Sequence, residues 1–427
     1  MKSAPNSPLL AVALATLHLP AIAQERGAVD QPDGTTTSAP SDLAQRSERL
    51  RQYLTERRSR LDIVASTKTD SGQILDWIHP GSQVASGRLA SPPPLDVMPD
   101  YGYRGIRPEL EDQEHARGPA GAVPILRRDV EEVLNGNPQR ELADFLSKHG
   151  RAKDRSTPMG GAGGEIKQPG ESDHHYASTC EDVLNQGGHG NISIWDPYVA
   201  DPNEFSLGQV NVATGPEVPV VQTVEAGWQD YPALYGSNGP HLFVFYTTNG
   251  YGKMGDNVGG YNLDVDGFVQ YSSITYPGML LPASKQSGWQ VTVHVRVLKY
   301  QGNWWIRAGN EWVGYYPCSL FGSNGLRYSA GSIAWYGEVV DLDDGVFTKT
   351  DMGSGQPALL GYGLAAFMCN LTTYRYRSGV PFHYQPTKIA TPTPLCYSLD
   401  DHSLSGGLWG SYFFFGGKGK SFWCKNK

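Results

Sequence analysis

The sequence predicts an all-β protein, an antiparallel two-sheet β-sandwich preceded by a smaller α+β segment. The clearest strand is Gln290–Leu298, in which valines alternate strictly with Thr, His and Arg, the pattern of a half-buried antiparallel strand. Similar runs follow at Asn303–Tyr316, Ser329–Val340 and Ser411–Phe415. Strand patterns do not alternate with helical ones, which argues against a parallel sheet. The many Gly and Tyr residues, with few charges, are typical of strands joined by tight turns.

The first residues have the pattern of an export signal. Met1–Ala23 carries Lys2, an apolar run from Leu9 to Ile22 and a small-residue cleavage site ending at Ala23. The run is too short for a membrane-spanning helix, so we predict a secretory signal peptide that is cleaved after Ala23. No later segment is long and apolar enough to span a membrane. We therefore expect a secreted protein, extracellular or, in a bacterium, periplasmic.

Residues 24–165 differ in character from the rest of the chain. An N-cap at Ser41 and a stripe of leucines predict a basic helix, and Ile63–Ile78 predicts a hairpin about an Asp-Ser-Gly turn. The glycine-rich stretch Gly150–Gly170 is a linker that a protease would cut readily. The sequence therefore divides into a signal peptide at 1–23, this segment with its linker at 24–165 and a β-sandwich domain at 166–427.

Charge and motif content exclude several classes of protein. The net charge of −8 argues against a nucleic-acid-binding protein, which usually has a basic face. The five cysteines form no CxxC motif or Cys/His cluster, and His174 and His175 have no third ligand at a diagnostic spacing. We therefore expect no metal and no cofactor. No GxSxG motif is present either, which argues against a serine hydrolase of that type.

Two strand-like runs each carry one glutamate. Val221–Pro232 holds Glu225 and Ser332–Val340 holds Glu338, so only a folded domain could bring the two carboxylates together. The alternation places Glu338 on the same face as Tyr336. An isolated glutamate on a strand is usually a solvated surface residue. On these residues alone, a surface role and a catalytic role both stay open.

A series of short motifs runs through the β-rich part in a fixed order. They are Asn191–Pro197, Glu204–Ser206, Glu225–Trp228, Leu234–Gly236, Tyr261–Leu263, Gly267–Gln270, Gly302–Trp305, Val313–Pro317, Gly337–Val339 and Met352–Gly355. In this order they resemble the neprosin family of secreted glutamic peptidases. Gly121–Arg127 more weakly resembles a segment of the family's activation peptide.

The resemblance implies a zymogen of a glutamic endopeptidase that cleaves preferentially after proline and in acid. Its two catalytic glutamates match Glu225 in the EAGW motif and Glu338 in the GEV motif. Residues 24–165 would then form an activation prosegment that inhibits the enzyme intramolecularly. The expected partners are proline-containing peptides or proteins, with no nucleic acid and no membrane, and we expect a monomer.

The resemblance also bears on the cysteines. The family's C-terminal disulfide corresponds to Cys396 and Cys424, whereas Gly260 and Val265 replace a second cysteine pair of the plant members. The pairing of the three remaining cysteines stays unassigned. These departures concern stability and subfamily, because neither position belongs to the glutamate pair.

Two glutamates can hydrolyse a peptide bond only if they share one proton. Two carboxylates that face the same water cannot both stay ionised at close range. The ionised member takes a proton from the attacking water, and the protonated member polarises the scissile carbonyl or protonates the leaving nitrogen. We expect a bell-shaped pH profile centred below neutral pH. Which glutamate is the base stays open.

Residues near the glutamates are candidates for substrate binding. Trp228, Trp335 and Tyr336 could form a wall against which a proline ring packs, or they could be core aromatics of the sandwich. Gln222 and Tyr246 are candidates for hydrogen bonds to a developing oxyanion.

An alternative function belongs to a different class. A β-sandwich rich in Trp and Tyr is also a common platform for carbohydrate binding, and paired glutamates occur in glycosidases. A long segment ahead of the domain favours the peptidase, because a binding module has no need of a cover. A degenerate, non-catalytic member of the family is a third hypothesis, and the presence of both glutamates argues against it.

Overall fold

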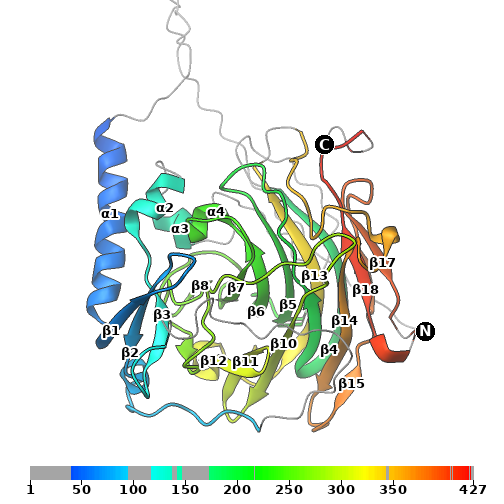
Figure 1. Cartoon of the computed structure of the whole chain (residues 1–427). Helices are drawn as coiled ribbons and strands as arrows, with labels where there is room; N and C mark the ends of the chain where they lie inside the picture. The colour runs from blue at the N-terminus through cyan, green and yellow to red at the C-terminus, as the bar shows by residue number, and fades with distance from the viewer. Residues whose placement is uncertain are drawn as a thin grey trace, which may run out of the picture. The chain divides into compact units, whose positions relative to one another are not determined.

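The computed structural model describes residues 40–94, 117–136, 142–146, 173–215, 217–342, 346–403, 405, 407–422 and 424. This part of the chain is mostly antiparallel β-structure, which confirms the predicted fold class (Figure 1). The predicted signal peptide and the glycine-rich linker Gly150–Gly170 lie outside the described residues. Of the helices described, none has both the length and the apolar character needed to cross a bilayer.

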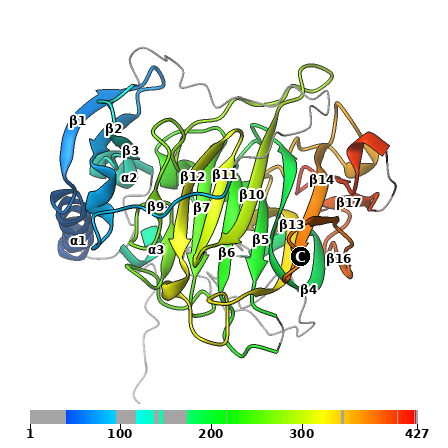
Figure 2. The same cartoon turned by 90° about the horizontal axis from the view of Figure 1, so that it is seen from below.

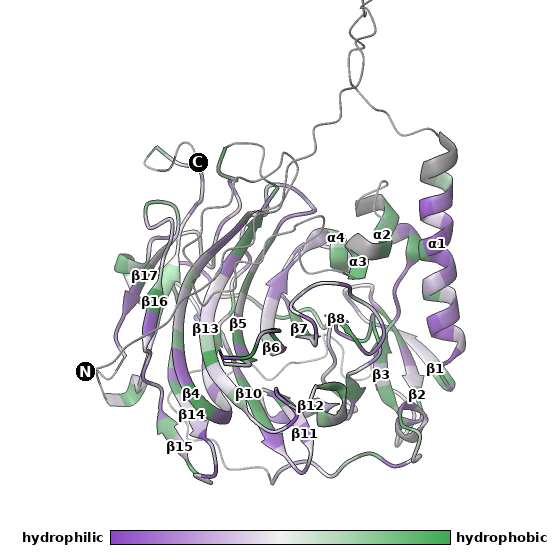
Figure 3. Ribbon diagram, turned by 180° about the vertical axis from the view of Figure 1, so that it is seen from behind, coloured by the Kyte–Doolittle hydropathy of each residue, from purple (hydrophilic) through white to green (hydrophobic). Residues whose placement is uncertain are grey.

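The described residues from 40 to 146, here called the N-terminal segment, form helices around a small antiparallel sheet of order β1-β2-β3. Its elements are α1 (Pro40–Ser59), β1 (Ile63–Lys68), β2 (Ile74–Ile78), η1 (Pro80–Gln83), β3 (Val123–Leu126), α2 (Val130–Gly136) and α3 (Leu142–Leu146). The pairing of β1 with β2 confirms the predicted hairpin at Ile63–Ile78. The predicted helix is α1, and Figure 3 shows that its surface is largely hydrophilic.

The β-rich domain is one hydrogen-bonded set of strands folded into two layers. Its strands are β4 (Asp173–Ser193), β5 (Phe205–Ala213), β6 (Thr223–Asp230), β7 (His241–Thr247), β8 (Gly259–Tyr261), β9 (Val269–Gln270), β10 (Thr292–Tyr300), β11 (Asn303–Ala308), β12 (Glu311–Pro317), β13 (Ala330–Asp341), β14 (Ala366–Arg375), β15 (Pro381–His383), β16 (Lys388–Ala390), β17 (Ser398–Asp401) and β18 (Phe413–Gly416). Short helical turns interrupt them at α4 (Pro232–Tyr235), η2 (Cys318–Leu320), η3 (Ala358–Leu360) and η4 (Gly407–Trp409).

The long strand β4 connects the two layers. Its first half pairs with β13 and β16, and its second half pairs with β10 and β14. The first layer therefore runs β8-β7-β6-β5-β13-β4, and the path continues through β10, β11, β12 and β9 in the second. Because β10 also contacts β5 and β6, the layers pack face to face, as Figure 2 shows from below.

Strand β10 differs from the expectation in one respect. The alternation predicted one solvated face, yet the strand is buried on both faces from Thr292 to Val297. Its polar residues contact side chains of the second half of β4, the neighbouring strand of the sheet, and of β14, which pairs with the other edge of β4. His294 lies 5.3 Å from the ring of His189, and the Arg296 guanidinium lies 5.7 Å from the Tyr374 ring centroid. Alternation in the sequence marks the two faces of a strand, but it does not show whether the polar face is exposed to solvent.

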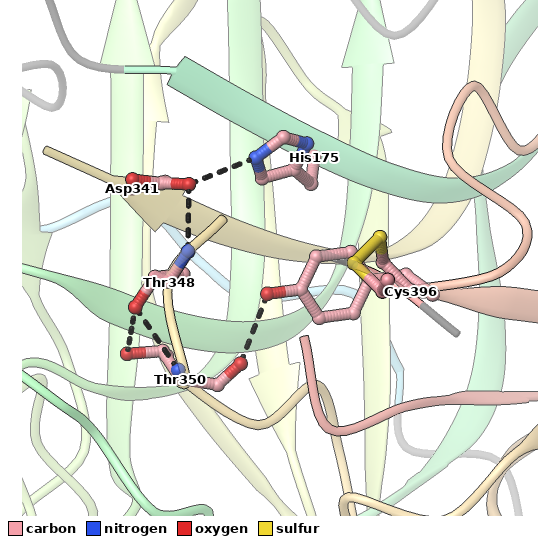
Figure 4. Close-up of a disulfide and its surroundings, with 7 residues drawn as sticks. His175, Asp341, Thr348, Thr350 and Cys396 are labelled. Carbon is pink, nitrogen blue, oxygen red and sulfur yellow. Dashed lines mark hydrogen bonds and ion pairs between the residues drawn. A yellow bond between two sulfur atoms is a disulfide. The ribbon is translucent and has the colours of Figure 1, made fainter. Parts of the chain in front are cut away.

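The predicted disulfide between Cys396 and Cys424 is present. Figure 4 shows it beside a buried polar cluster in which His175 contacts Asp341, and Tyr397 donates a hydrogen bond to the Thr350 carbonyl. Cys180, Cys318 and Cys369 are buried and are not part of this disulfide.

Candidate functional site

The two glutamates project from one face of three neighbouring strands. Glu225 lies on β6 opposite Asn211 of β5, and Glu338 lies on β13 opposite Leu207 of the same strand. Asn211 and Leu207 are four residues apart on β5, so all these side chains share one face. We call it the glutamate face. The fold thus places the two carboxylates across a single intervening strand, and both glutamates are closed to solvent, at 0% and 1% exposure.

Two hydroxyl groups hold Glu225. Thr223 Oγ1 donates a hydrogen bond of 2.8 Å to Glu225 Oε1, and Tyr251 OH donates one of 2.7 Å to the same oxygen. Burial raises the pKa of Tyr251 well above its ordinary value, and the charge of Glu225 raises it further, so this hydroxyl stays a donor. Tyr251 has a φ of 60°, in the left-handed region that bulky residues rarely adopt. Such strain is concentrated at functional sites.

A histidine holds the second glutamate. His174, near the start of β4, places its Nδ1 atom 2.6 Å from Glu338 Oε1, and each side chain is 1% exposed. The next residue, His175, lies on the opposite face and contacts Asp341 at 3.3 Å. The two adjacent histidines therefore contact different carboxylates. Among the described residues, no group of three or more His, Cys, Asp or Glu is placed to hold a metal ion.

We expect His174→Asn to lower kcat about tenfold to a hundredfold with little change in KM, because a misplaced catalytic group can cost about 10²-fold. The pH profile of kcat should also move, since the imidazole contacts the Glu338 carboxylate directly. Steady-state kinetics from pH 2 to 8 measure both effects. His175→Asn is the matched control and should change stability without moving the profile. An unchanged profile for His174→Asn would show that this contact only supports the fold.

Polar and aromatic groups share the glutamate face with Glu225 and Glu338. Asn211 Nδ2 donates a hydrogen bond of 3.1 Å to Tyr336 OH, and the Tyr176 ring meets the Tyr336 ring at 5.8 Å, edge to face. Burial raises the pKa of Tyr336 well above its ordinary value, and the charges of both Glu225 and Glu338 contribute. The structure therefore brings Tyr336, a residue proposed from the sequence, to both glutamates.

The structure places Trp228 and Trp335 on the other face, which is a correction to the expected aromatic wall. Each lies three residues from its glutamate, and residues an odd number apart in a strand point to opposite sides. Trp228 Nε1 donates a hydrogen bond of 2.8 Å to the Ser193 carbonyl in the second layer. The Trp335 ring lies so close to Gly190 that an added Cβ there would come within 3.0 Å of it. Both indoles belong to the core between the layers.

The two residues expected to stabilise an oxyanion also lie elsewhere. Tyr246 pairs with Val224, on the core face, and its hydroxyl donates to the Asp266 carbonyl at 2.5 Å. Gln222 precedes β6, and its Oε1 accepts a hydrogen bond of 3.1 Å from the Leu326 backbone. Both side chains are engaged away from the glutamates.

We expect Trp228→Phe to lower the free energy of unfolding by about 1 to 3 kcal/mol, because the smaller ring leaves a void and removes a buried hydrogen bond. KM for a peptide substrate should not change. Urea denaturation and steady-state kinetics measure the two quantities. Tyr336→Phe, a substitution on the glutamate face, should show the reverse pattern, with altered kinetics and a small change in stability. If KM rose several-fold in Trp228→Phe, the result would indicate that the indole contacts the substrate after all.

A model of the neprosin family matches residues 202–418, more than half of the chain. The chain belongs to the neprosin family. It is therefore a peptidase of the glutamic type. The neprosin match contains Glu225 and Glu338 with the whole of β5, β6 and β13, whereas His174 lies ahead of it.

Solved structures with some similarity to this chain include three proteins of low identity. Scytalido-glutamic peptidase with a peptide-based transition-state analogue has a TM-score of 0.30 and 8% identity, covering 57% of this chain and 98% of that one. SCP-B of the eqolisin family, in complex with the tripeptide Ala-Ile-His, has a TM-score of 0.30 and 9% identity over 57% and 98%. The Crh5 transglycosylase has a TM-score of 0.24 and 10% identity over 56% and 78%. TM-scores this low do not establish a common fold, so the family assignment depends on the match over residues 202–418.

Proposed function

We propose that this protein is exported as a latent precursor and that its mature form hydrolyses peptide bonds after proline in acid, using Glu225 and Glu338 as a dyad. The observation that carries the proposal is the placement of the two buried carboxylates on one face, across one strand. The signal peptide predicted at residues 1–23 supports secretion, because peptidases made for use outside the cell carry such a segment.

In the proposed reaction the dyad holds one proton and one water. The ionised glutamate removes a proton from the water as its oxygen attacks the scissile carbonyl carbon. The carbonyl π electrons move to oxygen, and the protonated glutamate donates a hydrogen bond to that oxygen. When the intermediate collapses, the C–N bond breaks and the leaving nitrogen takes a proton from the dyad. Thr223 and Tyr251 keep the Glu225 carboxylate in place throughout.

A cluster of aromatic rings next to Glu225 supports a preference for proline. Phe245 is the residue opposite Glu225 on β7, and its ring centroid lies 4.9 Å from Tyr261 and 6.1 Å from Tyr251. Proline has a compact apolar ring that packs well against aromatic faces. These three rings replace the two tryptophans as the proposed wall of the proline pocket.

Ion pairs between the N-terminal segment and an acidic stretch of the β-rich domain support latency. This stretch, residues 256–266, includes the short strand β8 and contains Asp256, Asp264 and Asp266. Arg57 Nη1 lies 2.5 Å from an oxygen of Asp256 and 3.1 Å from one of Asp266, and Arg128 binds both oxygens of Asp264 at 2.6 Å. Asp256 follows Tyr251 by five residues in the sequence. The N-terminal segment therefore binds the stretch of chain that comes directly after the donor to Glu225.

The decisive experiment acidifies the purified precursor and follows a quenched peptide with one internal proline from pH 2 to 8. The same peptide with alanine in place of proline is the specificity control. Cleavage after proline with an optimum below neutral pH is the expected result. Equal cleavage of both peptides would refute the proline preference alone. A processed precursor that cleaves neither peptide and binds polysaccharides would replace the peptidase by the carbohydrate-binding alternative.

A further inference from the structure

A glutamine lies midway between the two glutamates. Gln209, on β5, is opposite Gly227 of β6 and Tyr336 of β13. Along the sheet, Glu225 is two residues to one side of this row and Glu338 is two residues to the other side. Gln209 shares their face because residues paired across neighbouring strands project to the same side. The diagonal that joins the two glutamates passes through this residue.

The strand opposite Gln209 leaves space for its side chain. A Cβ built on Gly227 would lie 3.0 Å from the Cβ of Gln209 and still closer to the backbone of β5. No larger residue fits at position 227 without displacing β5 or the glutamine. The amide therefore faces a neighbour that has no side chain of its own.

The amide of Gln209 is buried without a hydrogen bond. The residue is 0% exposed, and neither Oε1 nor Nε2 has a partner in the described structure. Buried polar atoms in native proteins are almost always paired, so a side chain that leaves both ends unpaired calls for an explanation. The neighbouring Asn211, by contrast, donates to Tyr336. A substrate or a water that enters between the glutamates would supply the missing partners.

We propose that Gln209 is a further catalytic residue of the dyad. This inference rests on the proposed function. In the reaction, Oε1 accepts a hydrogen bond from the attacking water, and Nε2 donates one to the oxygen that becomes negative as the C–O bond forms. The proton of the water passes to the ionised glutamate, and Gln209 neither gains nor loses a proton. A neutral amide provides both a donor and an acceptor at one place, independently of pH.

Gln209→Met tests the proposal, because methionine has a similar volume and no polar amide. The mature enzyme is prepared by cutting the variant precursor with a trace of wild-type enzyme, which is then removed. We expect kcat to fall about 10²- to 10³-fold, as for loss of one oxyanion donor. The pH limits of the profile should not change, and the melting temperature should be equal or higher, because an unpaired polar group has been removed.

Gln270→Met is the matched control. Gln270 is also 0% exposed, but its Nε2 donates to the carbonyls of Ser272 and Thr275. Its replacement should lower the melting temperature and leave kcat unchanged. If Gln209→Met behaved like this control, with lower stability and near-normal kcat, Gln209 would be structural and the proposal would be overturned.

Gln209→Glu gives a second test that does not depend on the first variant. A glutamic acid keeps a hydrogen-bond acceptor but can donate only when it is protonated. Activity should therefore be retained on the acid side of the pH profile and lost on its alkaline side. A profile equal to that of wild type would overturn the proposal. An inactive wild-type enzyme in the same assay would instead refute the dyad, and it would do so separately from any effect at position 209.

Discussion

Glu225→Gln and Glu338→Gln are each expected to lower kcat/KM for the proline peptide by at least about 10³-fold. The substitution keeps the size and hydrogen-bonding shape of the side chain but removes its ability to take or give a proton, a function that contributes about 10² to 10⁴ in rate. It also leaves the remaining glutamate without the partner with which it shares a proton. The effect should appear in kcat, measured on mature enzyme across pH 2 to 8.

Glu181→Gln is the control for loss of a buried glutamate. Glu181 is 2% exposed on β4, lies on the core face and contacts Arg375 at 3.1 Å and Thr373 at 2.6 Å. We expect lower stability and retained activity. If both Glu225→Gln and Glu338→Gln still cleaved the peptide, the glutamic mechanism would be refuted for this chain, and another nucleophile or a metal would have to be sought.

Arg128→Met is expected to weaken latency more than any other single change in the N-terminal segment. Arg128 is 9% exposed and Asp264 6%, and removing one member of a buried ion pair costs about 3 to 5 kcal/mol because the other charge is left unpaired. We expect the precursor to be processed at a higher pH. The mature enzyme lies downstream of the substitution and should have the wild-type kcat. The extent of processing after a fixed incubation at each pH is the measurement.

Arg51→Met is the control for the latency experiment. Arg51 pairs with Glu131 at 2.8 Å inside the N-terminal segment, and both side chains are solvated. Loss of a solvated ion pair changes stability little, so processing of Arg51→Met should follow the wild-type pH dependence. Identical processing of wild type and Arg128→Met would show that the ion pair with Asp264 does not keep the precursor latent.

The direction in which pH changes latency follows from pKa shifts at the interface and inside the N-terminal segment. Burial alone would raise the pKa of Asp256, but the Asp266 backbone N–H and the charges of Arg57 and Arg60 lower it overall. At Asp76, burial is likewise outweighed by hydrogen bonds from Arg127 and Arg58, which bring the pKa to about 2. A folded-state pKa below the unfolded one gives stability that is present above about pH 4 and is lost as the pH falls through the folded value. Acid therefore weakens the N-terminal segment and its contacts.

The stability of the β-rich domain depends on pH in the opposite direction. Burial raises the pKa of Asp230 to about 7 and that of Asp351 to about 6. Between about pH 4 and these values the folded domain holds protons that the unfolded chain would release, so its stability rises as the pH falls. Acidification from pH 7 to 5 should raise the melting temperature of the mature domain. Calorimetry on the mature domain measures this, and a flat or falling melting temperature would contradict it.

Local pattern in the sequence predicts the fold class and, within each strand, which residues lie on the same side as the glutamate. Strand alternation is a property of consecutive residues, so the hairpin at Ile63–Ile78 and the shared face of Glu338 and Tyr336 could be read from it. The same rule, applied strictly, would have placed Trp335 on the core side, because it is an odd number of residues from Glu338. Counting residues from Glu338 along the strand thus distinguishes Tyr336, on the glutamate face, from Trp335, in the core.

Other parts of the site depend on contacts between distant segments. His174 meets Glu338 only because the start of β4 pairs with β13, and Tyr251 reaches Glu225 from a loop with no periodic pattern. The pairing of Arg128 with Asp264 joins residues more than a hundred positions apart. Charge and residue type identify such groups as candidates, but only the order of the strands decides which of them meet.

The start of β4 sets a limit on how the precursor can be trimmed. The strand begins at Asp173, and His174, its second residue, already contacts Glu338. Any cut in the preceding linker leaves this histidine on the mature enzyme, so ragged ends produced upstream should all be equally active. A protease that removed only one residue beyond Asp173 would excise the histidine itself. The mature enzyme thus tolerates imprecise processing on one side of Asp173 and almost none on the other.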